Sequence, residues 1–141
     1  MITEDQVVDA TCAELLAHGW EVLTRANTQQ RGPDIVARRD GRRLVVEAKG
    51  GTSARSPSNR FGQPFNANQV HSHVGRALVE ALIAVSAGDL AAIALPDERL
   101  HQHLIDRMAP ALAPAGVHVI WVDDDAKTGT GVGDLSTRAS E

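Results

Sequence analysis

The sequence predicts an α/β domain in which a central mixed β-sheet carries helices on both faces. Segments with helical periodicity alternate with short apolar runs along residues 1–122. Two of these runs flank Asp40-Gly41, which is a strong signal for a two-residue hairpin turn. Two later runs, 90–95 and 117–122, have the composition of buried strands. These observations together indicate the fold class.

The first half of the chain supplies a helix and three strands. Residues 3–6, Thr-Glu-Asp-Gln, match a capping box, and apolar residues then recur at helical spacing up to Gly19. Residues 20–25 read as a strand. Residues 34–39 and 43–49 are the two strands of the predicted hairpin.

The second half begins with residues 51–64, which are rich in Ser, Gly, Asn and Pro and predict a mobile loop. Asn66 then caps a helix that ends at Gly88. After the strand at 90–95, Asp97 is expected to cap a short helix that runs to about Met108.

The chain is expected to contain one domain, residues 1–122, followed by a tail. Residues 117–122 are the last predicted strand, and residues 123–141 are acidic, small and Gly-rich, which predicts disorder. A chain of 141 residues is long enough to bury a core.

Composition excludes several classes of function. The residues are 43% apolar and 23% charged, as in a soluble globular protein, and only 3% are aromatic, which argues against a base-stacking platform. Cys12 is the single cysteine, so an internal disulfide and a Cys-based zinc site are excluded. A polar start and the lack of a long apolar run favour a soluble cytoplasmic protein without membrane contact. The net charge of −4 opposes non-specific nucleic-acid binding unless basic residues cluster locally.

The hairpin register brings two carboxylates together. With Asp40-Gly41 as the turn, paired residue numbers sum to 81, so Asp34 lies opposite Glu47. Lys49 points to the same face of the sheet, two residues further on. Facing carboxylates destabilise a sheet unless a positive charge lies between them. The pattern therefore predicts a site for a hard divalent cation.

These residues resemble a known family. Residues 33 and 34, Pro-Asp, and residues 47–49, Glu-Ala-Lys, are similar to the PD-(D/E)XK motif of the restriction-endonuclease-like superfamily. The resemblance covers residues 3–122 and implies that family's αβββαβ core, here with a further helix and strand. It also implies a metal-dependent nuclease that hydrolyses phosphodiester bonds, with DNA and endonucleolytic cleavage favoured.

The resemblance assigns a role to each site residue. Asp34, Glu47 and the Ala48 carbonyl would bind Mg²⁺ or Mn²⁺, and Lys49 would orient water or stabilise charge on the phosphate. Members of similar families use a glutamate on the first helix, and Glu14 is the candidate for it. In some branches a Gln opens the second helix and a Tyr follows four residues later; Gln69 matches the first, and His73 replaces the second.

A locally basic segment is an independent indication of nucleic-acid binding. No Asp or Glu occurs between Glu47 and Glu80. The residues of this segment expected to contact nucleic acid are Arg55, Arg60, His73 and Arg76.

Simpler interpretations stand beside each assignment. Asp34 can be a turn residue, and Glu47 and Lys49 can form a surface ion pair. Gln69 can be the far end of a capping box with Asn66. The whole chain can be a non-catalytic module that binds nucleic acid or a protein on the same fold. The sequence leaves open DNA or RNA, endonuclease or exonuclease, specificity, biological pathway and whether the chain forms a homodimer.

Overall fold

The computed structural model describes residues 1–26, 32–52 and 64–132, which form three helices and six strands. The helices are α1 (Glu4–Ala17), α2 (Ala67–Ser86) and α3 (Arg99–Ala115). The strands are β1 (Glu21–Arg25), β2 (Ile35–Arg39), β3 (Arg42–Ala48), β4 (Leu90–Pro96), β5 (Val117–Val122) and β6 (Thr128–Val132).

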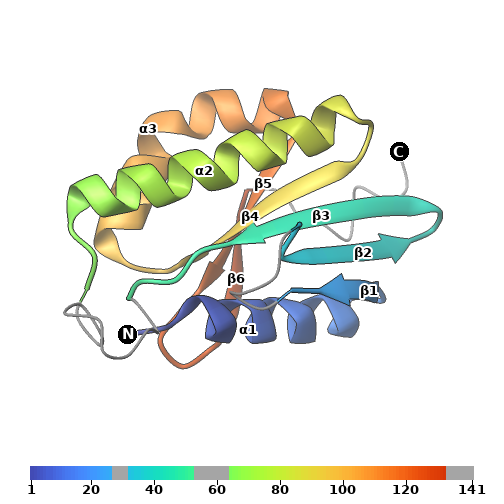
Figure 1. Ribbon diagram of the computed structural model, residues 1–141, viewed down its shortest axis with the longest axis horizontal. Helices are drawn as coiled ribbons and strands as arrows, with labels where there is room; N and C mark the ends of the chain where they lie inside the picture. The colour runs from blue at the N-terminus through green and yellow to red at the C-terminus, as the bar shows by residue number, and fades with distance from the viewer. Residues whose placement is uncertain (27–31, 53–63, 133–141) are drawn as a thin grey trace.

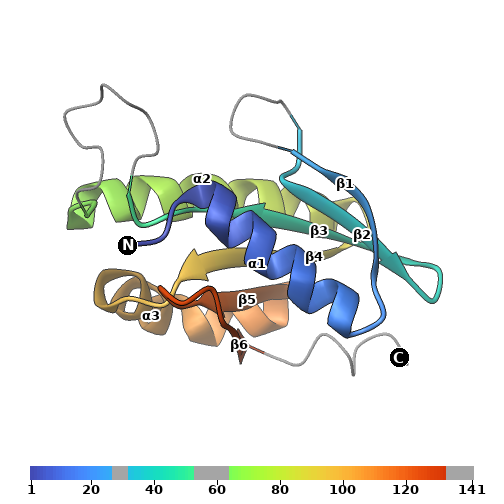
Figure 2. The same ribbon diagram turned by 90° about the horizontal axis from the view of Figure 1, so that it is seen from below.

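The strands form one mixed sheet in the order β1-β2-β3-β4-β5-β6 (Figure 1). β1, β2 and β3 are antiparallel neighbours, β3, β4 and β5 are parallel, and β6 is antiparallel to β5. α1 crosses one face of the sheet, whereas α2 and α3 cover the other (Figure 2). The predicted α/β class, with a mixed sheet and helices on both faces, is confirmed.

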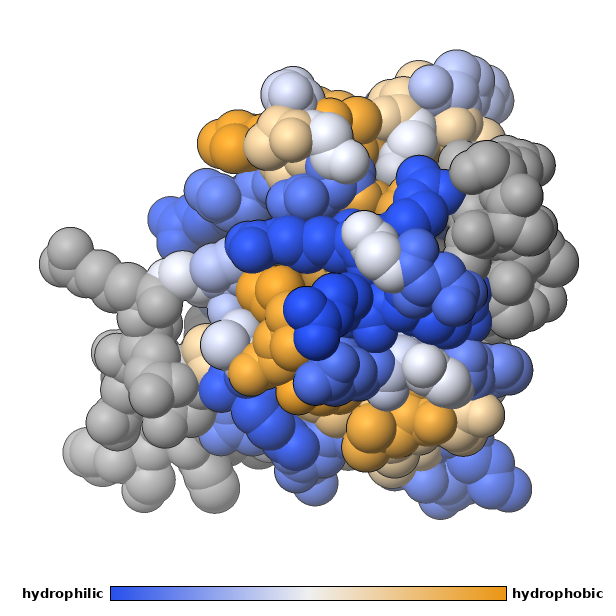
Figure 3. All heavy atoms as spheres, turned by 90° about the vertical axis from the view of Figure 1, so that its right-hand side faces the viewer, coloured by the Kyte–Doolittle hydropathy of each residue, from blue (hydrophilic) through white to orange (hydrophobic). Residues whose placement is uncertain are grey.

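The hairpin between β2 and β3 follows the predicted register. Asp40 and Gly41 form its turn with φ angles of 52° and 77°, the two positive values that a type I′ turn requires. Arg39 pairs with Arg42, and the ladder continues to the pair of Ile35 and Val46. The turn lies at the right-hand end of the sheet in Figure 1, and hydrophilic residues gather on that side of the molecule (Figure 3).

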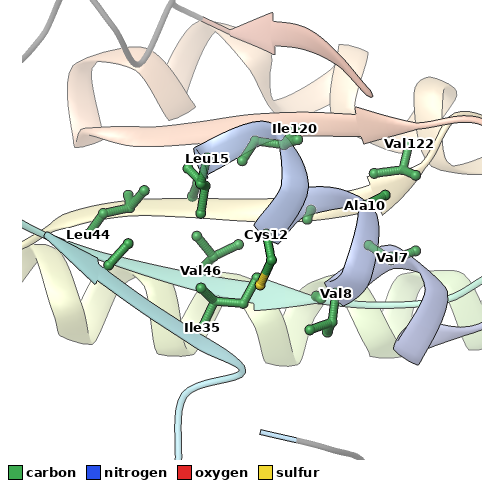
Figure 4. Close-up of a cluster of buried hydrophobic side chains, with 14 of the residues drawn as sticks. Val7, Val8, Ala10, Cys12, Leu15, Ile35, Leu44, Val46, Ile120 and Val122 are labelled. Atoms are coloured by element: carbon green, nitrogen blue, oxygen red, sulfur yellow. The ribbon is translucent and has the colours of Figure 1, made fainter. Parts of the chain in front are cut away.

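Alternation along β3 divides its side chains between two cores. Leu44, Val46 and Ala48 pack on the α1 side. Figure 4 shows Leu44 and Val46 in this cluster. Val45 packs on the opposite side with α2 and α3. Glu47 therefore lies on the α2 side of the sheet, at the end of β3 that is far from the turn.

Both predicted capping boxes are present. The Thr3 side chain accepts a hydrogen bond from the Gln6 N–H at 3.3 Å, and Gln6 Oε1 accepts one from the Thr3 N–H at 2.8 Å. Asn66 and Gln69 exchange the same two bonds, each at 2.9 Å, at the start of α2. The capping-box interpretation of Gln69 is thus confirmed.

The helix after β4 is longer than predicted. The sequence predicts a helix that starts after Asp97 and ends near Met108, whereas α3 runs from Arg99 to Ala115 through Pro110 and Pro114. Each proline removes one backbone hydrogen bond. The helix nevertheless continues to Ala115, and Leu112 in its last turns is buried in the core on this side of the sheet.

The prediction of a disordered tail is wrong for its first part. Residues Thr128–Val132 form β6, which pairs with β5. The intervening turn is held by Asp123, whose Oδ1 accepts hydrogen bonds from the N–H groups of Asp125 and Lys127 at 2.9 Å. An edge strand without an apolar stripe satisfies backbone groups rather than burying side chains, so its sequence resembles that of a loop. Residues 133–141 lie outside the described part of the chain.

None of the helices in the described residues is long and apolar enough to cross a membrane.

Candidate active site at the end of the central hairpin

Asp34 and Glu47 meet where β2 begins and β3 ends. One step beyond the pair of Ile35 and Val46, the register places them directly opposite each other. Asp34 is fixed there, because its Oδ2 accepts a hydrogen bond from the Ala48 N–H at 2.8 Å. Glu47 is 8% exposed, which makes it a rare buried acid among the described residues. A buried acid fixed opposite a second acid is not an ordinary surface charge.

Pro33 explains why the ladder stops at this point. The same register places Pro33 opposite Ala48, and a proline has no N–H to donate to the Ala48 carbonyl. The Ala48 N–H, which a regular ladder would direct to residue 33, is bound by the Asp34 carboxylate instead. The end of the hairpin therefore presents a main-chain carbonyl oxygen beside two carboxyl groups.

Lys49 continues the chain beyond β3 and lies beside an acid that the sequence did not single out. Its Nζ is 3.9 Å from Glu4 Oε1, and both side chains are about three-quarters buried, at 22% and 27% exposure. The Lys49 N–H donates to the Ala94 carbonyl at 3.0 Å, which ties the backbone of this residue to β4. The ammonium group is thus positioned from two elements of the fold.

The glycines that follow Lys49 bring α1 to this place. A Cβ built on Gly50 would lie 2.4 Å from the Glu4 backbone nitrogen, a distance that real side chains do not tolerate. The Gly51 N–H donates to the Ile2 carbonyl at 2.8 Å. Only a residue without a side chain lets the start of α1 come this close to Gly50. Because of this close contact, the Glu4 side chain lies beside Lys49.

The electrostatics of the site are dominated by buried acidic groups that lie close together. Burial, the charge of Asp34 and a hydrogen bond with the Asp34 side chain raise the pKa of Glu47 to about 8, although Lys49 opposes the shift. Burial and the same Asp34 charge also raise the pKa of Glu4 above its usual value. Burial is the main cause of both raised pKa values, and the charge of the neighbouring Asp34 adds to it.

Residues of α2 interact with the site electrostatically. Burial and the positive charges of Lys49 and Arg76 lower the pKa of His73, and the His73 ring meets the Phe65 ring edge-on at 4.5 Å. The charge of Glu80 contributes to the raised pKa of Glu47. His73 and Glu80 are seven residues apart on α2, about two turns of the helix, and each interacts electrostatically with a residue of the motif.

The predicted site residues are therefore brought together in part. Asp34, Glu47, Ala48 and Lys49 gather, with His73 nearby. The side-chain oxygen of Gln69 accepts a hydrogen bond from the Asn66 N–H in the capping box of α2. Arg55 and Arg60 lie outside the described residues. The ends of their segment are joined, since Thr52 and Pro64 form a bridge and the Phe65 N–H donates to the Gly51 carbonyl at 3.1 Å.

The structure does not bring Glu14 to the other predicted site residues. Glu14 lies in the last turns of α1, where its Oε1 is 2.7 Å from His18 Nε2, and a hydrogen bond with Thr128 lowers its pKa. Ten residues of helix, about 15 Å, separate it from Glu4. The helix start, and not the flank of its apolar face, reaches the motif. The Gly50-Gly51 pair after Lys49 is the sequence signal for that close approach.

The residues fit a hard divalent cation by chemistry. Mg²⁺ is commonly bound through one or two carboxylates and keeps several waters. Asp34, Glu47 and the Ala48 carbonyl would supply such a set. Across residues 1–26, 32–52 and 64–132, no group of three or more His, Cys, Asp or Glu side chains is arranged to hold a metal ion. Any ion would therefore depend on this pair, on the Ala48 carbonyl and on oxygen atoms from water or substrate.

Comparison with known proteins identifies a solved structure of similar fold. No family model and no curated protein sequence matches the chain. The crystal structure of a fdxN element excision controlling factor protein from Anabaena variabilis superposes with a TM-score of 0.56 at 18% identity, covering 92% of this chain and 99% of that chain. SfsA from Pyrococcus furiosus has a TM-score of 0.39 at 13% identity and covers 92% of this chain and 59% of that chain. The likeness to the Anabaena protein shows a shared fold, and the sheet and helices are consistent with a restriction-endonuclease-like core.

Proposed function

We propose that this chain is a metal-dependent nuclease whose active site is built from Asp34, Glu47, Lys49 and Glu4. The observation that carries the proposal is the buried Glu47 held opposite Asp34 at the end of β3, with a raised pKa that a cation would relieve. Folding alone gains nothing from facing acids. The pair is understood most simply as one half of a site whose other half is positive.

A nuclease needs positive charge at the phosphate and an activated water. Asp34, Glu47 and the Ala48 carbonyl would hold Mg²⁺ or Mn²⁺. When bound, such an ion supplies Lewis-acid polarisation of the phosphate and a lowered pKa for water. The residues of the chain then have to bind the substrate, place the water and balance charge.

Lys49 is the residue that faces the developing negative charge. Its ammonium interacts electrostatically with Glu47 and contacts Glu4, and from this position it would hold a phosphate oxygen or orient the attacking water. Glu4 positions that ammonium, because the two side chains approach to 3.9 Å and both are mostly buried. A lysine without this partner would sample many rotamers.

Several features favour nucleic acid as the substrate. The segment between Glu47 and Glu80 contains no acid, and within it Arg76 is exposed on α2 near His73. The name of the Anabaena protein of similar fold assigns it to control of the excision of an element, which is compatible with a role beside nucleic acid. We favour DNA over RNA and endonucleolytic over exonucleolytic cleavage, as the resemblance to the PD-(D/E)XK superfamily implies.

A non-catalytic module on the same fold is the second candidate. One observation favours it, namely that no third metal-ligating side chain joins the pair within the described residues. Such a module would bind nucleic acid or a protein partner without cleaving it, and Lys49 would then contribute only to affinity.

A cleavage assay distinguishes the two. Linear, circular, branched and single-stranded DNA and single-stranded RNA are incubated with the full chain and Mg²⁺ or Mn²⁺, and with EDTA as the blank. The expected result is metal-dependent cleavage of at least one substrate, lost in Asp34→Asn and Lys49→Ala. The matched controls are Asp106→Asn and Lys127→Ala, because both residues are exposed and lie outside the site. Absence of cleavage with every substrate would favour the second candidate, whereas cleavage that persists in both site variants would overturn the assignment of Asp34 and Lys49 to the active site.

A further inference from the structure

The outward face of α2 carries a stripe of exposed apolar side chains. Val79, Leu82 and Ile83 are 56%, 41% and 57% exposed, and their spacing places them on one surface of the helix. The opposite face of α2 already packs on the sheet through its buried residues, which are Val70, Val74, Ala77, Ala81 and Ala84. A helix that is apolar on two faces is normally buried on both. The outer stripe therefore lacks a partner within the described chain.

The stripe has a gap before Val79, at Gly75, and projecting side chains after it, at Leu82 and Ile83. A Cβ built on Gly75 would meet nothing within 4 Å, so the surface is open there. One turn past Val79, Leu82 and Ile83 stand out from the helix. At 100° per residue, Gly75 and Leu82 fall on one flank of the stripe, and Arg76 and Ile83 fall on the other.

We propose that this stripe binds a second copy of the same chain, with the two α2 helices antiparallel about a twofold axis at Val79. With a rise of 1.5 Å per residue, Leu82 of the second copy then lies within about 1.5 Å of Gly75 along the helix axis, on the same flank. The leucine fills the gap that the glycine leaves. On the other flank, Ile83 of the second copy packs on the aliphatic stem of Arg76.

Charge complementarity favours a second copy over an unrelated partner. Arg76 and Glu80 are both exposed and lie on the same flank of α2. In the antiparallel pair, Glu80 of one copy comes within about 3 Å, along the axis, of Arg76 of the other, and the reverse contact forms at the same time. The same surface of α2 thus contains the gap at Gly75 and the leucine that fills it. It also contains both members of the charge pair, Arg76 and Glu80.

The mass of the full chain in solution, measured by sedimentation equilibrium without nucleic acid, tests the proposal. The expected mass is that of two chains. Val79→Arg and Gly75→Gln should each weaken the dimer by about tenfold or more. Gln has a better helix propensity than Gly and meets open space here, so circular dichroism should show an unchanged fold for Gly75→Gln. Leu16→Gln is the matched control, since Leu16 is 60% exposed on α1 and its replacement should leave the mass unchanged.

A charge exchange tests the orientation of the two helices. Arg76→Glu should weaken the dimer by placing like charges together, and the double variant Arg76→Glu, Glu80→Arg should restore it. A wild-type mass of one chain up to about 100 µM, a dimer that survives Val79→Arg, or a double variant no stronger than Arg76→Glu alone would each overturn the proposal. Because these measurements use no nucleic acid, their failure would leave the proposed nuclease activity untouched.

Discussion

Asp34 and Glu47 face each other across the β2–β3 pair closely enough for their side chains to share a hydrogen bond. A bond between two carboxyl groups requires that one of them keep a proton. Together with burial and the Asp34 charge, this contact raises the pKa of Glu47 to about 8. In the metal-free chain, a proton therefore supplies the positive charge that the pair requires.

The first prediction concerns the stability of the metal-free protein at different pH values. Because the pKa of Glu47 rises from 4.5 to about 8 on folding, the folded chain binds more protons than the unfolded chain between these values. Stability should therefore be greatest near pH 5 and should fall as pH rises through 8. Thermal melts in EDTA from pH 5 to pH 9 measure this fall.

Glu47→Gln provides the control for that measurement. The glutamine cannot ionise, so this contribution to the pH dependence should vanish. Above pH 8 the variant should be more stable than wild type, by on the order of 2 kcal/mol. The contradictory result is a wild-type melting temperature that stays constant or increases from pH 5 to pH 9, with the same behaviour in the variant. It would show that ionisation of Glu47 does not destabilise the folded chain.

The second prediction separates the two glutamates of α1. Glu4→Gln removes the charge beside Lys49 and should reduce single-turnover cleavage by about ten- to hundredfold, because the ammonium loses its fixed position. Glu14→Gln alters a pair with His18 at the far end of the helix and should change the rate less than about twofold. Equal losses in the two variants would mean that the Glu4 contact has no role in the reaction.

The third prediction concerns the approach of α1 to the motif. Gly50→Ala places a methyl group 2.4 Å from the Glu4 nitrogen, so the helix start must move. The expected cost is about 1–3 kcal/mol, or a melting temperature lower by several degrees. Gly129→Ala is the control, because a Cβ there meets nothing within 4 Å. A melting temperature for Gly50→Ala equal to that of the control would show that the contact is loose.

The fourth prediction concerns the end of the chain. Truncation after Val122 removes β6, exposes the edge of β5 and removes the hydrogen bond between Thr128 and Glu14. The melting temperature should fall by about 5 °C or more. Calorimetry of the truncated and full chains checks this, and a difference within 2 °C would mean that β6 adds nothing to the stability of the domain.

The sequence was sufficient wherever the structure depends on local rules. The Asp40-Gly41 turn fixes the hairpin register, and the register in turn places Asp34 opposite Glu47. The capping boxes at Thr3 and Asn66 fix the starts of two helices. Each of these features involves neighbouring residues whose spacing can be read directly.

The remaining errors come from contacts between distant segments. Whether the start or the end of α1 lies at the motif depends on how the helix crosses the sheet, and the periodicity of Leu15 and its neighbours does not encode that direction. α3 continues through Pro110, and its last turns bury Leu112 in the core, a long-range contact that the local proline signal does not reveal. β6 forms because β5 offers an unpaired edge, which the Gly-rich segment from Thr128 onward satisfies without an apolar pattern.

Thermal melting with and without divalent metal tests the central claim most directly. Wild-type protein should be stabilised by Mg²⁺ or Mn²⁺, by about 2.7 kcal/mol at a hundredfold excess over Kd, whereas Asp34→Asn should not respond. Lys49→Ala should still respond, because it retains both carboxyl groups, while its cleavage activity is lost. A wild-type melting temperature that ignores both metals at millimolar concentrations would contradict the assignment of Asp34 and Glu47 as a metal site.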